Sequence, residues 1–310
     1  MPPLVWLVTG CSSGFGEAFV HSIIARGDKV IATGRNAADR LGHLQATGAA
    51  ILPLDVTAPK QDIEATVQKA ILIHGTIDVL VNNAGYCELG FLEDIPPDKW
   101  MAQLNTNFFG CVNITQALLP HFRSKKSGTI VFMSSIWTWT SGPGIGPYGV
   151  SKHALASPSS SHSLIAVSLL WPAYDIADAT QGYAGTLQAE VSQFNIHPIL
   201  FDIGHFRSSI TSPTSVSFTP PSASTADDYN SLFTSLTAAA AQLHGNQPGD
   251  PRKCTELILD VVRGEGLAKG LERPARIPVG KDAVQVVKDA CQSMLETVGD
   301  WERVVSGTDF

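Results

Sequence analysis

Tyr148 and Lys152 bring a phenol and an ammonium group into one short stretch of the chain, Tyr148-Gly149-Val150-Ser151-Lys152. At a spacing of i and i+4, the two side chains share one face of a helix, where the cation would stabilise a phenolate. An unperturbed phenol titrates near pH 10, so proton transfer near pH 7 needs roughly 4 kcal/mol of such stabilisation. Taken alone the pair is weak evidence, because solvated helices carry the same spacing.

A glycine-rich stretch near the N-terminus suggests a nucleotide site. It follows an apolar run and precedes a helical pattern, so its glycines would let a pyrophosphate approach backbone N–H groups at a helix N-terminus. The spacing is GxxxGxG rather than the commoner GxGxxG, and a turn without a ligand is the alternative. The expected dinucleotide contacts are Gly10, Ser12, Ser13, Gly14, Phe15 and Gly16.

Arg35 stands at the end of the second apolar run, where a carboxylate would bind the adenosine 2′-hydroxyl. Its guanidinium can instead pair with a 2′-phosphate, which favours NADP(H), while NAD(H) stays possible and a solvated loop arginine is the alternative. Asp55 and Val56 follow the third apolar run, where the adenine amino group would lie. An aspartate that caps the next helix is an equally ordinary interpretation of Asp55.

Further polar residues follow in a characteristic order: Asn82-Asn83-Ala84-Gly85, then Asn107, then Ser135, 13 residues before Tyr148. Together with the glycine turn and the Tyr148/Lys152 pair, this order closely resembles the classical short-chain dehydrogenase/reductase family. The resemblance covers residues 4 to about 207, apart from 157–181. Within that family the sequence looks like the members grouped with 17β-hydroxysteroid and retinol dehydrogenases.

The resemblance implies hydride transfer between a nicotinamide cofactor and an alcohol or carbonyl carbon, without a metal. By it, Tyr148 is the acid/base, Ser135 hydrogen-bonds the substrate oxygen, and Asn107 positions a water. Lys152 holds the nicotinamide ribose and lowers the pKa of Tyr148, and both residues count among the expected cofactor contacts. The adenosine side is expected to involve Asn83, Ala84 and Gly85. A catalytically inactive NADP(H)-binding regulatory or sensor protein is the alternative function.

Short apolar runs alternate with helix-length segments along the chain. This rhythm predicts an α/β fold with a doubly wound parallel sheet, a Rossmann fold, as a single domain over residues 1–310. The expected strands are 4–9, 29–33, 50–54, 77–81, 129–133 and 197–203.

Residues 157–181 interrupt this pattern inside the helix that carries Tyr148 and Lys152. The stretch contains Pro158, Pro172 and a serine cluster, and proline breaks helices. Removing it joins Ala156 to Gly182 and restores a continuation that resembles the family's helix. We hypothesise a retained intron translated in frame, and a genuine family-specific loop is the alternative. In this family that helix commonly packs against a partner subunit, so a homo-oligomer is possible but the insertion puts it in doubt.

Residues 208–245 are rich in Ser, Thr, Pro and Ala and are interpreted as a candidate substrate lid. With the stretch 137–145, the lid is expected to line the substrate pocket. The aromatic residues of these two segments indicate a moderately apolar small-molecule alcohol or carbonyl substrate. They are Trp137, Trp139, Phe218 and Phe233.

Composition excludes several classes of protein. The chain has 310 residues, and its hydrophobic content of 44% favours a globular protein. Its net charge of −7 makes nucleic acid a poor partner. No apolar run approaches the roughly 18 residues of a membrane span. The five cysteines have no metal-ligand spacing, and the histidines, His205 included, are lone; we therefore expect no metal site and a cytoplasmic location.

Overall fold

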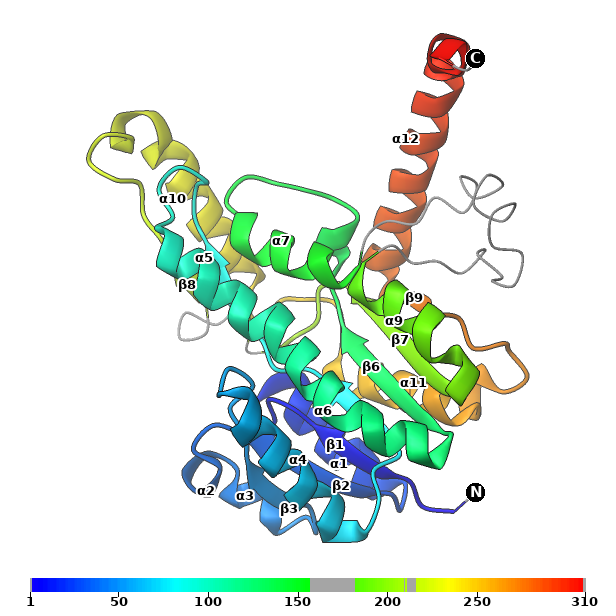
Figure 1. Cartoon of the computed structure of the whole chain (residues 1–310). Helices are drawn as coiled ribbons and strands as arrows, with labels where there is room; N and C mark the ends of the chain where they lie inside the picture. Colours follow the sequence, from blue (N-terminus) through cyan, green and yellow to red (C-terminus); the bar gives the residue numbers. More distant parts are fainter. Residues whose placement is uncertain (1, 157–181, 209, 211–215, 309–310) are drawn as a thin grey trace.

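Seven parallel strands of the described chain form one sheet (Figure 1). The computed structural model describes residues 2–156, 182–208, 210 and 216–308. The strand order is β3-β2-β1-β4-β6-β7-β9, which changes direction at β1, as in doubly wound folds. The strands are β1 Val5–Val8, β2 Lys29–Gly34, β3 Ala50–Pro53, β4 Val79–Asn82, β6 Gly128–Met133, β7 Ile196–Ile203 and β9 Arg276–Val279.

Helices cover both faces of this sheet, and alternate residues of β1 show the division. Trp6 and Val8 belong to a core shared with α1 and α11, whereas Val5 and Leu7 belong to a core shared with α4, α6 and α9. Burial on both faces explains why the strands are continuously apolar instead of alternating. These helices are α1 Gly14–Ala25, α4 Lys60–His74, α6 Gly110–Lys125, α9 Tyr183–Val191 and α11 Pro251–Arg263.

The remaining elements lie around the carboxyl ends of the strands and at the periphery. A separate two-stranded sheet pairs β5 with β8. Among the described residues, no helix combines the length and apolar character that a membrane crossing needs. These elements are α2 Ala37–Arg40, α3 Gly42–Gln45, β5 Cys87–Leu89, α5 Pro97–Leu104, α7 Gly146–Leu155, β8 Val216–Phe218, α10 Ala226–Leu243 and α12 Lys281–Val305.

The expected doubly wound single-domain fold is confirmed, and the six predicted strands differ from the observed ones by at most two residues at either end. Strands β5, β8 and β9 were not predicted. The hypothesis about residues 157–181 falls outside the described residues. On either side of them, α7 ends at Leu155 and α9 begins at Tyr183. Ala156 and Ala184 are buried in the same core, so the two helices pack on one face of the sheet.

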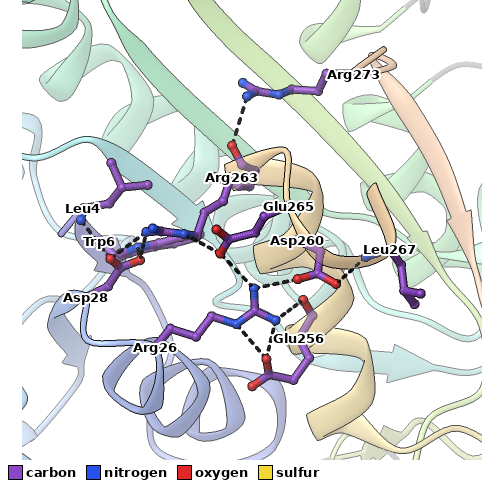
Figure 2. Close-up of polar contacts among 11 residues, drawn as sticks. Leu4, Trp6, Arg26, Asp28, Glu256, Asp260, Arg263, Glu265, Leu267 and Arg273 are labelled. Atoms are coloured by element: carbon purple, nitrogen blue, oxygen red, sulfur yellow. Dashed lines mark hydrogen bonds and ion pairs between the residues drawn. The ribbon is translucent and has the colours of Figure 1, made fainter. Parts of the chain in front are cut away.

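Arg26, at the end of α1, joins this helix to α11 (Figure 2). Its guanidinium donates to Glu256 at 2.8 Å and to Asp260 at 2.7 Å. Both acceptors belong to α11, so a segment more than 200 residues away in sequence is fixed against the first helix. The contact holds the C-terminal part of the chain against the N-terminal strands.

Asp28 makes a second connection, which is almost completely buried. Its carboxylate accepts from Arg263 at 2.7 and 2.8 Å, from the indole of Trp6 at 2.9 Å and from the N–H of Leu4 at 2.9 Å. The side chains of Asp28 and Arg263 are 1% and 7% exposed. Because a buried charge without its partner is costly, each of these two residues requires the other.

We predict that Asp28→Asn lowers the free energy of unfolding by about 3 kcal/mol, since it leaves the Arg263 charge buried beside a neutral amide. The measurement is urea denaturation followed by circular dichroism. Lys60→Gln is the control, because Lys60 meets Glu64 only at the surface, at 3.8 Å; it should change stability by less than about 0.5 kcal/mol. A loss below about 1 kcal/mol for Asp28→Asn would show that the buried pair is dispensable.

Candidate active site

Ser135, Tyr148 and Lys152 meet at the carboxyl end of β6. Ser135 is the second residue after this strand, and Tyr148 and Lys152 lie on α7. The side chain of Ser135 is hydrogen-bonded to the Tyr148 phenol, and the Lys152 Nζ lies 5.7 Å from the centre of the Tyr148 ring. All three residues are buried. The three predicted catalytic groups are therefore brought together in one place.

Burial controls the charge state of this cluster. It raises the pKa of Tyr148 above its ordinary value, with a further rise from Cys87, while the hydrogen bond with Ser135 acts in the opposite direction. The pKa of Tyr148 is therefore raised, whereas the family resemblance implies that Lys152 lowers it. Burial also lowers the pKa of Lys152. The Lys152 Nζ donates to the carbonyl of Met133 at 2.8 Å. The phenol is thus neutral at pH 7, which is the form that can donate a proton to a carbonyl oxygen.

Asn107 lies on a π-helical turn, Asn105–Phe109, between α5 and α6. Such turns place a side chain where a regular helix would not. Its Oδ1 accepts from the N–H of Tyr86 at 3.1 Å, and its Nδ2 donates to the carbonyl of Tyr86 at 3.0 Å and to Ser151 Oγ at 3.1 Å. Ser151 in turn donates to the carbonyl of Tyr148 at 2.7 Å. Asn107 therefore connects the segment after β4 to the helix that carries Tyr148.

The glycine turn between β1 and α1 is closely packed. Gly10 has φ +72°, a conformation that favours glycine, and a Cβ there would lie 2.8 Å from the Cα of Ala84. A Cβ on Gly16 would lie 2.2 Å from the carbonyl oxygen of Gly10. Gly14 also has a positive φ, of 62°. The turn is thus shaped by residues without side chains at the N-terminus of α1, and this shape fits a pyrophosphate group.

Asn83 and Thr9 hold this turn against the end of β4. The Asn83 Nδ2 donates to the carbonyls of Thr9 at 2.8 Å and Gly10 at 3.1 Å. In return, the Thr9 hydroxyl accepts from the N–H groups of Asn83 and Ala84, both at 3.0 Å. The amide nitrogen of Asn83 therefore shapes the glycine turn. Gly85, next along the chain, lies beside the Asn107 carboxamide.

A polar cavity of about 420 Å³ opens beside the end of β2. Asp55 holds its own loop, because its Oδ1 accepts from the N–H and the hydroxyl of Thr57 at 2.9 and 2.7 Å. Val56 is buried against Gly110 and does not line this cavity. Arg40, which lies on the short helix α2, also lines the cavity but was not among the predicted cofactor contacts. The lining residues are Arg35, Asn36, Arg40, Pro53, Leu54 and Asp55.

Trp139 is fixed by a buried ion pair at the ends of β7 and β9. Its indole N–H donates to Asp202 at 2.6 Å, and the Arg276 guanidinium lies 4.3 Å from its ring centre. Arg276 also donates to Asp202 at 2.6 Å. Trp137 is half-buried beside Gly142. Arg276 and Cys87 were not among the predicted site residues, because neither β9 nor β5 was predicted.

The described part of the candidate lid is attached to the segment after β4. Strand β8 pairs with β5, and the Thr219 hydroxyl donates to the buried Glu88 carboxylate at 2.8 Å. Lys99 donates to both of these side chains at 2.9 Å. Helix α10 adds two ring contacts, Phe233 on Phe218 and Tyr229 on Phe91. These contacts hold β8 and α10 beside the segment that contains Cys87, the neighbour of Tyr148.

His205 follows β7 and pairs with the first turn of α12. Its Nδ1 lies 2.9 Å from Asp282 Oδ2, which also accepts from the His205 N–H at 2.6 Å. Partial burial raises the pKa of Asp282, but the hydrogen bonds from His205 and Ala283 outweigh it and leave that pKa below its usual value. Within the described ranges, no group of three His, Cys, Asp or Glu residues is arranged to hold a metal ion.

Comparisons with known proteins find one matching family model and several similar oxidoreductases. The family model described as short chain dehydrogenase matches residues 4–164. The uncharacterized oxidoreductase YusZ of Bacillus subtilis is 31% identical over 284 residues, which are 89% of this chain and 88% of that protein. Oxidoreductase BOA17 of Botryotinia fuckeliana is 28% identical over 97% of each chain. The crystal structure of a short-chain dehydrogenase from Streptomyces avermitilis superposes with a TM-score of 0.77 at 29% identity, covering 99% of this chain and 100% of that one.

We predict that Gly16→Ala destabilises the protein by about 1–3 kcal/mol, because the added methyl group meets the Gly10 carbonyl and must displace the turn. Thermal and urea unfolding measure the effect, and titration with NADPH should show weaker binding. Gly42→Ala is the matched control, since a Cβ there meets nothing within 4 Å. Equal stability and equal NADPH affinity for the two variants would contradict the close packing of the turn.

Proposed function

Because the chain belongs to the short-chain dehydrogenase family, we propose that it is an NADP(H)-dependent oxidoreductase. It interconverts an alcohol with a ketone or aldehyde on a moderately apolar small molecule. The observation that carries this proposal is the buried cluster of Ser135, Tyr148 and Lys152 at the carboxyl end of the sheet. Ligands of open α/β sheets bind at this end of the strands.

In the proposed reduction, the neutral Tyr148 phenol donates its proton to the carbonyl oxygen and becomes a phenolate. In the oxidation, the Tyr148 phenolate takes the proton from the alcohol. The Ser135 hydroxyl hydrogen-bonds the same oxygen and stabilises the charge that develops on it. Asn107 holds α7 in place through Ser151, and by family resemblance it also positions a water for proton relay. A bound nicotinamide nucleotide supplies or accepts the hydride.

The proposed cofactor contacts extend along the ends of β1, β2, β3 and β4. The turn Gly10 to Gly16 would hold the pyrophosphate, with Ser12, Ser13, Gly14 and Phe15 at the start of α1. Asp55, Asn83, Ala84 and Gly85 would form the adenosine side of this arrangement, to which Val56, with its side chain buried against Gly110, would contribute its backbone. Lys152 and Tyr148 would form its nicotinamide side. The packed turn with two glycines at positive φ supports this assignment.

The preference for NADP(H) rests on charge. Arg35 and Arg40 line one cavity at the end of β2, and two guanidinium groups there would attract a 2′-phosphate. The aromatic contacts of α10 and β8 support an apolar substrate and a lid over 208–245. The absence of disulfides among the five cysteines supports a cytoplasmic location.

We predict that Tyr148→Phe lowers carbonyl reduction at least about 100-fold, because the proton donor is lost, while NADPH binding changes little. Turnover is followed by NADPH oxidation with a panel of apolar ketones and aldehydes, and binding by fluorescence titration. Tyr183→Phe is the control: Tyr183 is also a largely buried phenol, with a pKa raised to about 12 by burial, but it packs between Phe108 and Phe132. Full turnover by Tyr148→Phe would remove Tyr148 from the mechanism. NADPH binding by the wild-type protein without any turnover would favour the sensor function.

We predict that Arg35→Gln weakens NADPH binding about 10- to 100-fold and leaves NADH binding unchanged, because a charge-assisted contact with the 2′-phosphate is lost. Isothermal titration with both nucleotides measures the change. Arg303→Gln is the control, since Arg303 is an exposed residue of α12. Equal losses for NADPH and NADH, or a wild-type preference for NADH, would overturn the role of Arg35.

A further inference from the structure

Helix α12 leaves the body of the molecule and carries the C-terminus away from it (Figure 1). Its first turns pack against β9 and the short turn Ile136–Thr138 that follows Ser135. Ala283 is its one buried residue. From Cys291 to Val305 every side chain is exposed. This 25-residue helix is therefore held by its first turns, and the rest of it packs on nothing in the described chain.

The exposed part of α12 is not polar all round, as a solvated helix would be. Apolar residues recur at alternating intervals of four and three residues, which is the heptad pattern of a coiled coil. Met294, Val298 and Trp301 are 56%, 53% and 57% exposed. We call this stripe the α12 seam, and its members are Val287, Cys291, Met294, Val298, Trp301 and Val305.

The opposite side of the helix is polar and internally bonded. Gln285 donates to Asp289 at 2.7 Å and Gln292 donates to Glu296 at 2.8 Å, each across one helical turn. Pairs at this spacing stabilise a helix in water. The helix is thus supported on its solvent side. The seam, with the exposed Leu295 and Val304 at its two edges, has the width that one further helix covers.

We propose that the α12 seam binds the same seam of a second copy of this chain, as an antiparallel coiled coil centred on Glu296. In this register Cys291 packs opposite the partner's Trp301, and Met294 opposite the partner's Val298. The two-fold symmetry repeats each contact, as in most homodimers. Because α12 points away from the body, the two bodies lie at opposite ends of the helix pair (Figure 1).

Charge complementarity selects this orientation. Lys288 and Glu302 lie on the same edge of the seam, each one residue after an apolar seam position. In the antiparallel register Lys288 lies beside the partner's Glu302, and the symmetry makes this ion pair twice. On the same edge, Leu295 packs against the partner's Leu295 at the centre of the helix pair. In a parallel pair, Lys288 would instead lie opposite the partner's Ala283, and Glu302 opposite the partner's Thr297. Neither of these residues is charged.

The test begins with the oligomeric state of the full chain, measured by analytical ultracentrifugation over a range of concentrations. We expect a reversible dimer, and Val298→Asp should raise its dissociation constant at least about 100-fold by placing two carboxylates in the seam. Ser293→Asp is the matched control on the polar side, and it should change the dissociation constant less than about threefold. Activity and circular dichroism should be the same for all three proteins, so this outcome does not depend on the proposed function.

Further variants test the orientation. Lys288→Glu and Glu302→Lys should each weaken the dimer about three- to tenfold, and the double variant should restore it. Leu295→Cys in a Cys291→Ser background should form an interchain disulfide on oxidation, whereas wild-type Cys291 should not. A monomer at concentrations on the order of 100 μM would overturn the proposal. An interchain disulfide between wild-type Cys291 residues would also overturn it, because that bond requires a parallel pair. A monomer in which Cys291 is shielded from thiol reagents would overturn it as well, because another segment must then cover the seam.

Discussion

The hydrogen bonds between Thr9 and Asn83 are the interaction on which the rest of the site depends. They join the carboxyl ends of β1 and β4, so the glycine turn is placed by the sheet and not by a loop of its own. Each side chain bonds to the backbone of the other segment, so the position of the turn relative to β4 is fixed. A glycine turn fixed in this way is organised before any ligand arrives, so that less conformational entropy is lost when a ligand binds.

The same connection continues to the catalytic helix. From Asn83 the chain passes directly to Tyr86, whose N–H and carbonyl are both bonded to Asn107, and Asn107 bonds to Ser151 one turn from Tyr148. Three segments far apart in sequence are therefore placed by amide and hydroxyl groups, of which Thr9, Asn107 and Ser151 are buried, and their hydrogen bonds fix the relative positions of the segments. On this account Asn107 and Asn83 contribute to the reaction first by geometry, because they set where the phenol lies relative to the nucleotide turn.

The fold and the family could be predicted because both depend on local signals. Doubly buried strands are apolar runs, and the order from Gly10 to Lys152 is specific enough that the family assignment is confirmed. Strand β9 was not predicted, because Arg276 and Pro278 interrupt its apolar pattern and its partner strand lies more than 70 residues earlier. The role of Arg276 depends on this distant pairing, whereas that of Arg40 depends on how α2 folds beside the ends of β2 and β3. The subgroup within the family and the retained-intron hypothesis for 157–181 stay predictions.

The central claim is that this site moves a hydride and does not only bind a nucleotide. The most direct test supplies NADPH deuterated at the nicotinamide C4 together with apolar ketones and aldehydes, and follows the products by mass spectrometry. The account predicts deuterium on the carbinol carbon of at least one alcohol product, with no transfer by Tyr148→Phe. NADPH binding by the wild-type protein without deuterium transfer to any carbonyl compound would contradict it.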